Sequence, residues 1–428
     1  MSDRSGSGWR AVAGALVSAS LMVVPGTGQA QHLLVPMDRA QSDHLRAYGL
    51  VYEAISNGAP AEWLLNYRDG SFLLPAQRRV TERAALMGVR VEELSGNALA
   101  RIRSEIEGAN MESVPLEKAP EIAVYTPLNS SPWDDAVTLA LEYAGIPYQR
   151  VWDREVLSGR LGEYDWLHLH HEDFTGQYSK FYLNYAGTPW LQEEVKRNEA
   201  VAEEFGYPDV PALKKAVARE IRAYVEAGGL LFAMCTATET LDLALAAGDT
   251  DIAAAFADGS PPDPDADSRM RWESALAFSD AEVVLDPGLS AFSDIDGHQV
   301  NTPWRLPLGS FALFDFSAKI DPVPTMLTQD HERILPDFYG LTTSFSPSRV
   351  KPGVTVLAED RANGVVKYLH GPIGEGSFTF LGGHDPEDPQ HLIGDQATDL
   401  TLHRNSPGYR LILNNVLYPA AKRKALKT

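Results

Sequence analysis

The sequence predicts a mixed α/β protein, in which a parallel β-sheet carries helices on both faces and follows a smaller α/β segment. From residue 121 onward, short apolar stretches alternate with amphipathic ones, the order of strands and helices in a parallel sheet. The run LLFAM at 230–234 is continuously apolar, as buried parallel strands are. The chain has 428 residues, 44% of them hydrophobic, which is enough for a large core.

The amino-terminal residues 1–30 have the pattern of an export signal. Arg4 and Arg10 precede an apolar run at 11–24, and small residues at 28–30 suit a signal peptidase. The run is too short to span a membrane, and no later run is apolar enough to do so. We therefore expect a protein without a membrane span that is exported to the periplasm or the extracellular space.

Composition narrows the classes of partner. The formal net charge of −21 argues against binding to nucleic acid or to anionic membrane surfaces. A single cysteine, Cys235, excludes an internal disulfide. The fold must therefore be held together by core burial.

The smaller segment is predicted over residues 37–110. Apolar residues at helical spacing predict a helix that ends at Gly58, and Arg68-Asp69-Gly70 predicts a hairpin loop between two strands. Two more helical stretches follow, and the second ends near Gly108. The proline-containing residues 111–120 are predicted to link this segment to the main domain, 121–428.

The main domain is predicted from its alternating pattern. IAVYTP, PYQRVWD, YDWLHLH and LLFAM are the expected strands, with helices at DDAVTLALEYAG and at 211–227. VVKYLH and SFTFL flank GPIGEG and predict an antiparallel hairpin. SPGYRLILNN predicts a closing helix.

Cys235 is the first candidate for catalysis. It follows the LLFAM strand, and Thr236 and Glu239 have the spacing of a capping box that opens a helix. A thiol at a helix amino-terminus is stabilised as a thiolate, and a sharp strand-to-helix turn resembles a nucleophile elbow. The Thr236 N–H would then support an oxyanion. The alternative is that Cys235 is a small buried hydrophobe.

A nucleophile needs a base, and the sequence offers His384. This histidine follows the SFTFL strand and Gly382-Gly383, and Asp385 and Glu387 come directly after it. One of these carboxylates would hold the imidazole in a single tautomer. The alternative is a polar turn in which the histidine caps the strand.

These residues resemble the class I glutamine amidotransferase superfamily. Its members carry Gly-x-Cys-x-Gly-x-Gln at the elbow, where this chain has Ala233, Cys235, Ala237 and Glu239. They carry His-Pro-Glu after a late strand, where this chain has His384-Asp385-Pro386-Glu387. The resemblance implies a flavodoxin-like sheet and cysteine-dependent hydrolysis of an amide.

A closer resemblance covers nearly all of the chain after residue 30. The motifs WLLNYR, PWDDAVTLAL, YDWLHLHHEDFTGQ, FAMC, DPVPTML, GGHDPED and NSPGYRLILNN resemble a secreted bacterial family often labelled asparagine synthetase B. The sequence has no Ser-Gly-Gly-x-Asp-Ser loop and no cysteine near Gln31, as ATP-dependent amidation of that kind would need. Walker and Gly-x-Gly-x-x-Gly motifs are also absent, so we predict no nucleotide cofactor. The expected substrate is a small-molecule amide or amino acid.

The histidine-rich stretch 166–177 is the third candidate. Alternation along the strand puts His168 and His170 on one face, and His171, Glu172 and Asp173 follow at its carboxyl end. Beside Cys235 they would form a substrate-binding wall and supply a second oxyanion donor.

Two alternatives remain open for this stretch. One is a divalent metal site drawn from His168, His170, His171, Asp173 and His391. The other is a hydrogen-bonded polar cluster at the sheet edge. On the metal reading, or if the aromatic residues stack on a sugar, the protein would bind metal or carbohydrate without catalysis. A third reading is a scaffold with a protein partner in the cell envelope.

Overall fold

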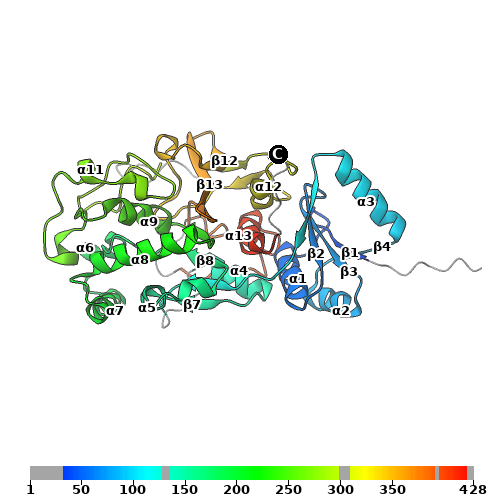
Figure 1. The fold of residues 1–428 in the computed structure, drawn as a ribbon, viewed down its shortest axis with the longest axis horizontal. Helices are drawn as coiled ribbons and strands as arrows, with labels where there is room; N and C mark the ends of the chain where they lie inside the picture. The colour runs from blue at the N-terminus through cyan, green and yellow to red at the C-terminus, as the bar shows by residue number, and fades with distance from the viewer. Residues whose placement is uncertain (1–31, 128–134, 298–308, 391–394, 422–428) are drawn as a thin grey trace, which may run out of the picture.

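The structure, a computed structural model, describes residues 32–127, 135–297, 309–390 and 395–421. It is a mixed α/β fold with two β-sheets and helices (Figure 1). The predicted export signal at 1–30 and His391 lie outside the described residues. In the part of the chain that is described, no helix is long and apolar enough to cross a membrane.

The first sheet has five antiparallel strands in the order β4-β1-β3-β2-β5. Its helices cover both faces: α1 and α2 pack on one, and α3 packs on the other through Ile102 and Ile106 (Figure 1). The elements are β1 His32–Val35, α1 His44–Ser56, β2 Ala61–Leu65, β3 Ser71–Pro75, α2 Arg78–Met87, β4 Glu92–Leu94, α3 Gly96–Gly108 and β5 Glu112–Leu116.

Two boundaries of this segment differ from the sequence prediction. The sheet starts at β1, before residue 37, and β5 lies inside the stretch 111–120 that was predicted as a linker. Pro115 suggested a break in structure. A proline is compatible with an edge strand, and β5 is at the edge of the sheet.

The second sheet has nine strands in the order β11-β10-β12-β13-β14-β9-β8-β6-β7. In this order, each strand from β14 through β9, β8 and β6 to β7 is parallel to its neighbour. Each strand from β11 through β10, β12 and β13 to β14 is antiparallel to its neighbour. The strands are β6 Ile122–Tyr125, β7 Gln149–Val151, β8 Trp166–Leu169, β9 Leu230–Met234, β10 Ser310–Leu313, β11 Ile334–Pro336, β12 Thr355–Asp360, β13 Val365–Ile373 and β14 Gly376–Leu381.

The prediction of a parallel sheet is therefore corrected to a mixed one. The hairpin of β13 and β14 was predicted and is confirmed. Because β13 runs antiparallel to β14, the sheet continues beyond it through the antiparallel strands β12, β10 and β11. These strands are short or have irregular register, which weakens their sequence pattern.

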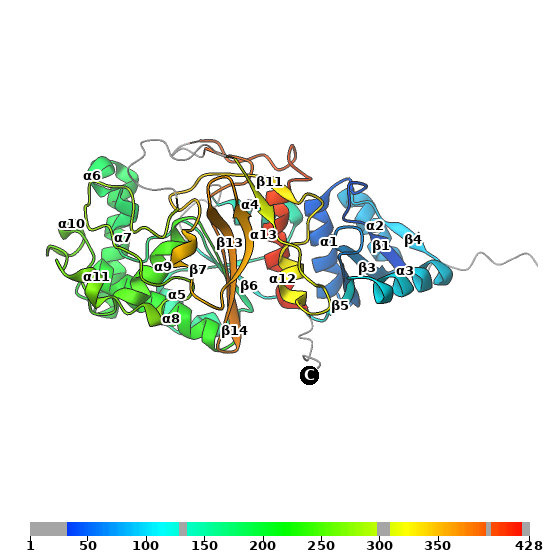
Figure 2. The ribbon, with the colours of Figure 1, turned by 90° about the horizontal axis from the view of Figure 1, so that it is seen from above.

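Helices cover both faces of the second sheet. On one face lie α4 and α13, with α12 beside them, and on the other lie α5, α8 and α9 (Figures 1 and 2). Their bounds are α4 Ala136–Ala144, α5 Asp153–Leu157, α8 Val210–Glu226, α9 Thr236–Ala247, α12 Pro322–Leu327 and α13 Pro407–Leu417. Outside them lie α6 Tyr182–Tyr185, α7 Pro189–Phe205, α10 Ala255–Asp258 and α11 Ala266–Arg269.

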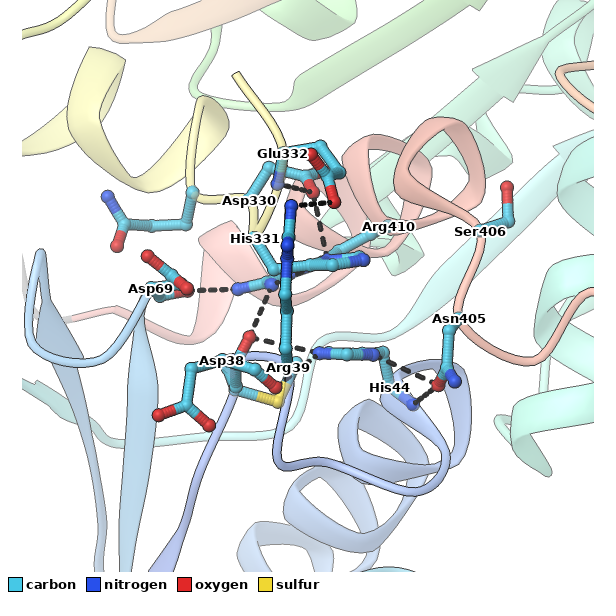
Figure 3. Close-up of polar contacts among 12 residues, drawn as sticks. Asp38, Arg39, His44, Asp69, Asp330, His331, Glu332, Asn405, Ser406 and Arg410 are labelled. Atoms are coloured by element: carbon cyan, nitrogen blue, oxygen red, sulfur yellow. Dashed lines mark hydrogen bonds and ion pairs between the residues drawn. The ribbon is translucent and has the colours of Figure 1, made fainter. Parts of the chain in front are cut away.

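The two sheets share one hydrophobic core, because α1 packs against α4 and α13 between them (Figure 2). At Gly49 of α1, a Cβ atom would lie 1.8 Å from the carbonyl oxygen of Ala144, so only glycine allows this approach of α1 to α4. The fully buried Arg410 of α13 donates to the carbonyl oxygens of Met37, at 2.7 Å, and of Asp69 (Figure 3).

Candidate active site

Cys235 lies at the turn between β9 and α9, and its backbone is strained. Its φ and ψ angles are 50° and −136°, a region that residues with a side chain rarely occupy. Such a conformation costs about 1–3 kcal/mol and persists only where the surroundings enforce it. Here Cys235 N–H donates to the carbonyl oxygen of Gly383 at 3.2 Å, and Ala237 N–H donates to that of His170 at 2.9 Å.

The thiol is buried, with 2% of Cys235 exposed, beneath residues 338–343, which we call the strap. Leu341 N–H in the strap donates to Cys235 Sγ at 3.3 Å, and Thr236 Oγ1 lies 3.7 Å from the sulfur. The strap also accepts hydrogen bonds through Thr342 O and Tyr339 O from the backbone of Gly383 and His384.

The predicted capping box does not form. Cys235 is the N-cap of α9, one residue earlier than predicted, so Thr238 occupies the third helical position and its hydroxyl donates to Cys235 O at 2.7 Å. Glu239 is buried instead. It accepts from Ser293 Oγ at 2.6 Å and from Thr342 Oγ1 at 2.8 Å. Burial, with Asp296 nearby, raises the pKa of Glu239 to about 7.

His384 belongs to a buried chain of polar side chains that ends at Asp135. His384 Nδ1 lies 3.1 Å from His170 Nε2, and His170 Nδ1 lies 3.3 Å from Asp135 Oδ1. His168 Nε2 lies 3.4 Å from the other oxygen of Asp135. Burial, then the nearby His384, lowers the pKa of His170 to about 4, so its imidazole is neutral at pH 7.

The contacts between Asp135, His170 and His384 assign the tautomers of the two histidines. A carboxylate only accepts, so His170 carries its proton on Nδ1 and its Nε2 accepts from His384 Nδ1–H. Burial opposes the charge of Asp135, but His168 and His170 outweigh it and hold the pKa of Asp135 well below its usual range. In neutral His384 the proton is then on Nδ1, and Nε2 carries the lone pair.

The structure corrects the choice of acid. Asp385 accepts from Glu387 N at 2.8 Å and from Thr398 Oγ1 at 2.7 Å, which closes its own turn. Glu387 pairs with His403 Nδ1 at 2.7 Å. In the described part of the chain, neither carboxylate is hydrogen-bonded to His384, because Asp385 is engaged by Glu387 N and Thr398 and Glu387 is engaged by His403.

The loop after β8 plays a different part from the one predicted. Glu172 accepts from the His170 backbone N–H at 2.9 Å, and Asp173 accepts from the backbone N–H groups of Thr175, Gln177 and Ser179. Both carboxylates thus shape the loop and are not aimed at Cys235. The donor beside the thiol comes from Leu341 in the strap instead.

Two groups of side chains have ligand atoms close enough to hold a metal ion within the described residues. They are His170, His171 and His384, and Asp135, His168 and His170, each set with its atoms within 4.8 Å of one another. Asp173 belongs to neither group.

Sequence reasoning missed Asp135. A signal for it existed, because an aspartate directly before an apolar helix is an N-cap, and it follows the carboxyl end of the first strand of the main domain.

Comparisons with known proteins identify no family. No family model and no curated protein match the sequence. Among solved structures, the cytoplasmic protein STM3548 from Salmonella typhimurium is 11% identical with a TM-score of 0.35, and the match covers 71% of this chain and 100% of that one. The cytoplasmic protein STM1381 from Salmonella typhimurium LT2 is 12% identical, with the same TM-score and coverage.

Proposed function

We propose that the protein is a cysteine-dependent amide hydrolase of the glutamine amidotransferase type. The strained backbone of Cys235 at a strand-to-helix turn is the observation that carries this proposal. A thiol that merely filled the core would not need such a conformation, whereas a nucleophile elbow uses it to present the side chain above the sheet.

The strand arrangement supports the same proposal. Numbered along the chain, the five parallel strands β6, β7, β8, β9 and β14 have the spatial order 2-1-3-4-5, which is the flavodoxin-like order. Cys235 and His384 follow neighbouring parallel strands at their carboxyl ends, where such sheets bind ligands.

In the proposed reaction, Cys235 Sγ attacks the carbonyl carbon of the amide while its proton passes to His384. His384 returns that proton to the leaving amine, and water then hydrolyses the thioester to release the acid and restore the thiol. Asp135 and His170 position His384 and support its positive charge. The Thr236 N–H is the oxyanion donor.

The strap must move for this reaction. No hydrogen bond joins Cys235 Sγ to His384 among the described residues, and the thiol is almost fully covered. Displacing residues 338–343 would expose the sulfur and release Leu341 N–H. The substrate would be a small-molecule amide or amino acid, and export to the periplasm or beyond remains part of the proposal.

The test is the rate at which a small alkylating reagent labels Cys235 in the folded chain across pH, read by intact mass. The only cysteine of the chain makes the signal unambiguous. We expect labelling to persist well below the ordinary thiol pKa of about 8.5. Labelling only after denaturation would refute the proposal that Cys235 is a nucleophile.

A matched pair of variants tests the base. His384→Gln should move the pH midpoint of labelling upward toward the ordinary thiol value. His370→Gln, which replaces a buried histidine of β13, should not. A screen for ammonia release from small amides then follows, and activity that survives Cys235→Ala would exclude the mechanism.

A further inference from the structure

Three histidines converge at the carboxyl ends of β8 and β14. We infer that His170, His171 and His384 bind a divalent transition-metal ion, with zinc as the fitting probe. Each histidine offers a nitrogen, and the three ligand atoms lie within 4.8 Å of one another. Imidazole is a preferred ligand of such ions.

The spacing inside the cluster fits a shared ion. His170 Nε2 and His384 Nδ1 are 3.1 Å apart. Two nitrogens on one tetrahedral zinc, at Zn–N distances of about 2.0–2.1 Å, are roughly 3.3–3.4 Å apart. An ion can therefore replace the proton that the two rings share after a small adjustment of either ring.

The surroundings of His170 match those of a metal ligand. Its other nitrogen, Nδ1, lies 3.3 Å from the buried carboxylate of Asp135, the arrangement that orients histidines on zinc. His171 is exposed, so a three-histidine site here opens toward solvent and leaves a fourth position for water.

The second group, Asp135, His168 and His170, is the weaker candidate. Asp135 Oδ1 already accepts from the backbone N–H groups of Val137 and Thr138 at the start of α4. A metal ion on this oxygen would compete with the helix cap.

Metal binding has a consequence for the site, and this part rests on the proposed function. An ion held by His384 prevents that ring from serving as the base for Cys235. The metal and the proton relay therefore compete, and zinc would inhibit the hydrolase.

The test is a zinc titration of the full chain against a chromophoric chelator, repeated with cobalt, whose visible absorption reports the ligand geometry. We expect one ion per chain. His171→Ala should weaken zinc binding about 100-fold or more, and Asp135→Asn about 10–100-fold. His403→Ala, a histidine paired with Glu387 away from the cluster, should bind as the unchanged chain does.

Two further measurements separate the inference from the proposed function. Cys235→Ala should still bind zinc, and zinc should slow alkylation of Cys235 in the unchanged chain but not in His171→Ala. Zinc affinity that is the same in His171→Ala as in the unchanged chain, or that is lost in Cys235→Ala, overturns the ligand set. Zinc binding with a thiol inert to alkylation would leave the metal site standing and remove the hydrolase.

Discussion

Cys235 and Gly340 show how single residues define the site. The positive φ of Cys235 is held by two backbone hydrogen bonds: Cys235 N–H donates to Gly383 O, just after β14, and Ala237 N–H donates to His170 O, just after β8. Gly340 lies against the sulfur. A Cβ atom there would be 3.0 Å from Cys235 Sγ and 3.0 Å from the backbone of Gly383.

Gly340→Ala should therefore press the strap away from the thiol. We expect a loss of about 1–3 kcal/mol in the free energy of unfolding, as for overpacking, and an altered rate of Cys235 alkylation. Denaturant unfolding and intact-mass labelling measure the two effects. Gly187→Ala is the control, since a Cβ atom there meets nothing within 4 Å, and equal effects in both variants would contradict the close packing.

Glu239 should make the stability of the protein depend on pH. Burial raises its pKa from 4.5 to about 7, so the folded protein holds this proton more tightly than the unfolded chain does. The free energy of unfolding should then fall as the pH rises from about 4.5 through 7, by up to roughly 3 kcal/mol.

Glu239→Gln should flatten that part of the profile. Denaturant unfolding at several pH values measures the difference between the two chains. Asp242, whose pKa burial raises to about 6, is present in both chains and cancels in that difference. Identical profiles for the two chains would show that Glu239 ionises normally.

At the scale of elements, α4 is tied to the site through its N-cap residue, Asp135. Asp135 caps α4 through Val137 N and Thr138 N, and the same carboxylate faces His168 and His170 of the β8 segment. One side chain thus sets both where a helix begins and which tautomer His170 adopts.

The two roles of Asp135 can be separated by substitution. Asparagine caps helices about as well as aspartate, so Asp135→Asn should keep α4 while it weakens the support of His170. We expect Cys235 alkylation at neutral pH to slow by roughly ten-fold, which corresponds to one pKa unit. Asp135→Ala should lose about 1 kcal/mol more of stability through the lost cap. An unchanged labelling profile in Asp135→Asn would remove Asp135 from the relay.

At the scale of the whole molecule, the two sheets are joined through α1, α4 and α13. Arg410 stands at this junction, where it faces His331 and reaches the backbone of Met37 and Asp69 (Figure 3). The ring of His44 stacks on that of His331 at 4.1 Å. Polar side chains form part of this junction, so its stability depends on every buried polar group there having a hydrogen-bond partner.

Arg410→Met should destabilise the molecule by about 1–3 kcal/mol for each buried carbonyl that loses its donor, namely those of Met37 and Asp69. We also expect the first sheet to unfold before the second, which would split the single denaturant transition into two. Arg404→Met is the control, since Arg404 is exposed and, within the described residues, its guanidinium donates to Thr401 O alone. A single denaturant transition with an unchanged midpoint in Arg410→Met would show that the apolar contacts alone hold the two sheets together.

Local patterns predicted most of the elements of this fold. The hairpin around Asp69, the helices α1, α4, α8 and α13, and the turn at Cys235 all follow from apolar spacing and turn residues. The strands β1, β10 and β11 were not predicted, because they are short and lack a distinctive period.

The sequence by itself determined that Cys235 and His384 follow buried strands, because period and composition are local properties. Only the tertiary structure decided their partners. Asp135 and His170 are far apart along the chain, and the parallel order of β6, β8, β9 and β14 brings their elements to one edge. Leu341 reaches the site because the strap accepts hydrogen bonds from the backbone of Gly383 and His384. Asp385 and Glu387 are near His384 in sequence but turn away from it, since proximity along a chain does not set the direction of a side chain.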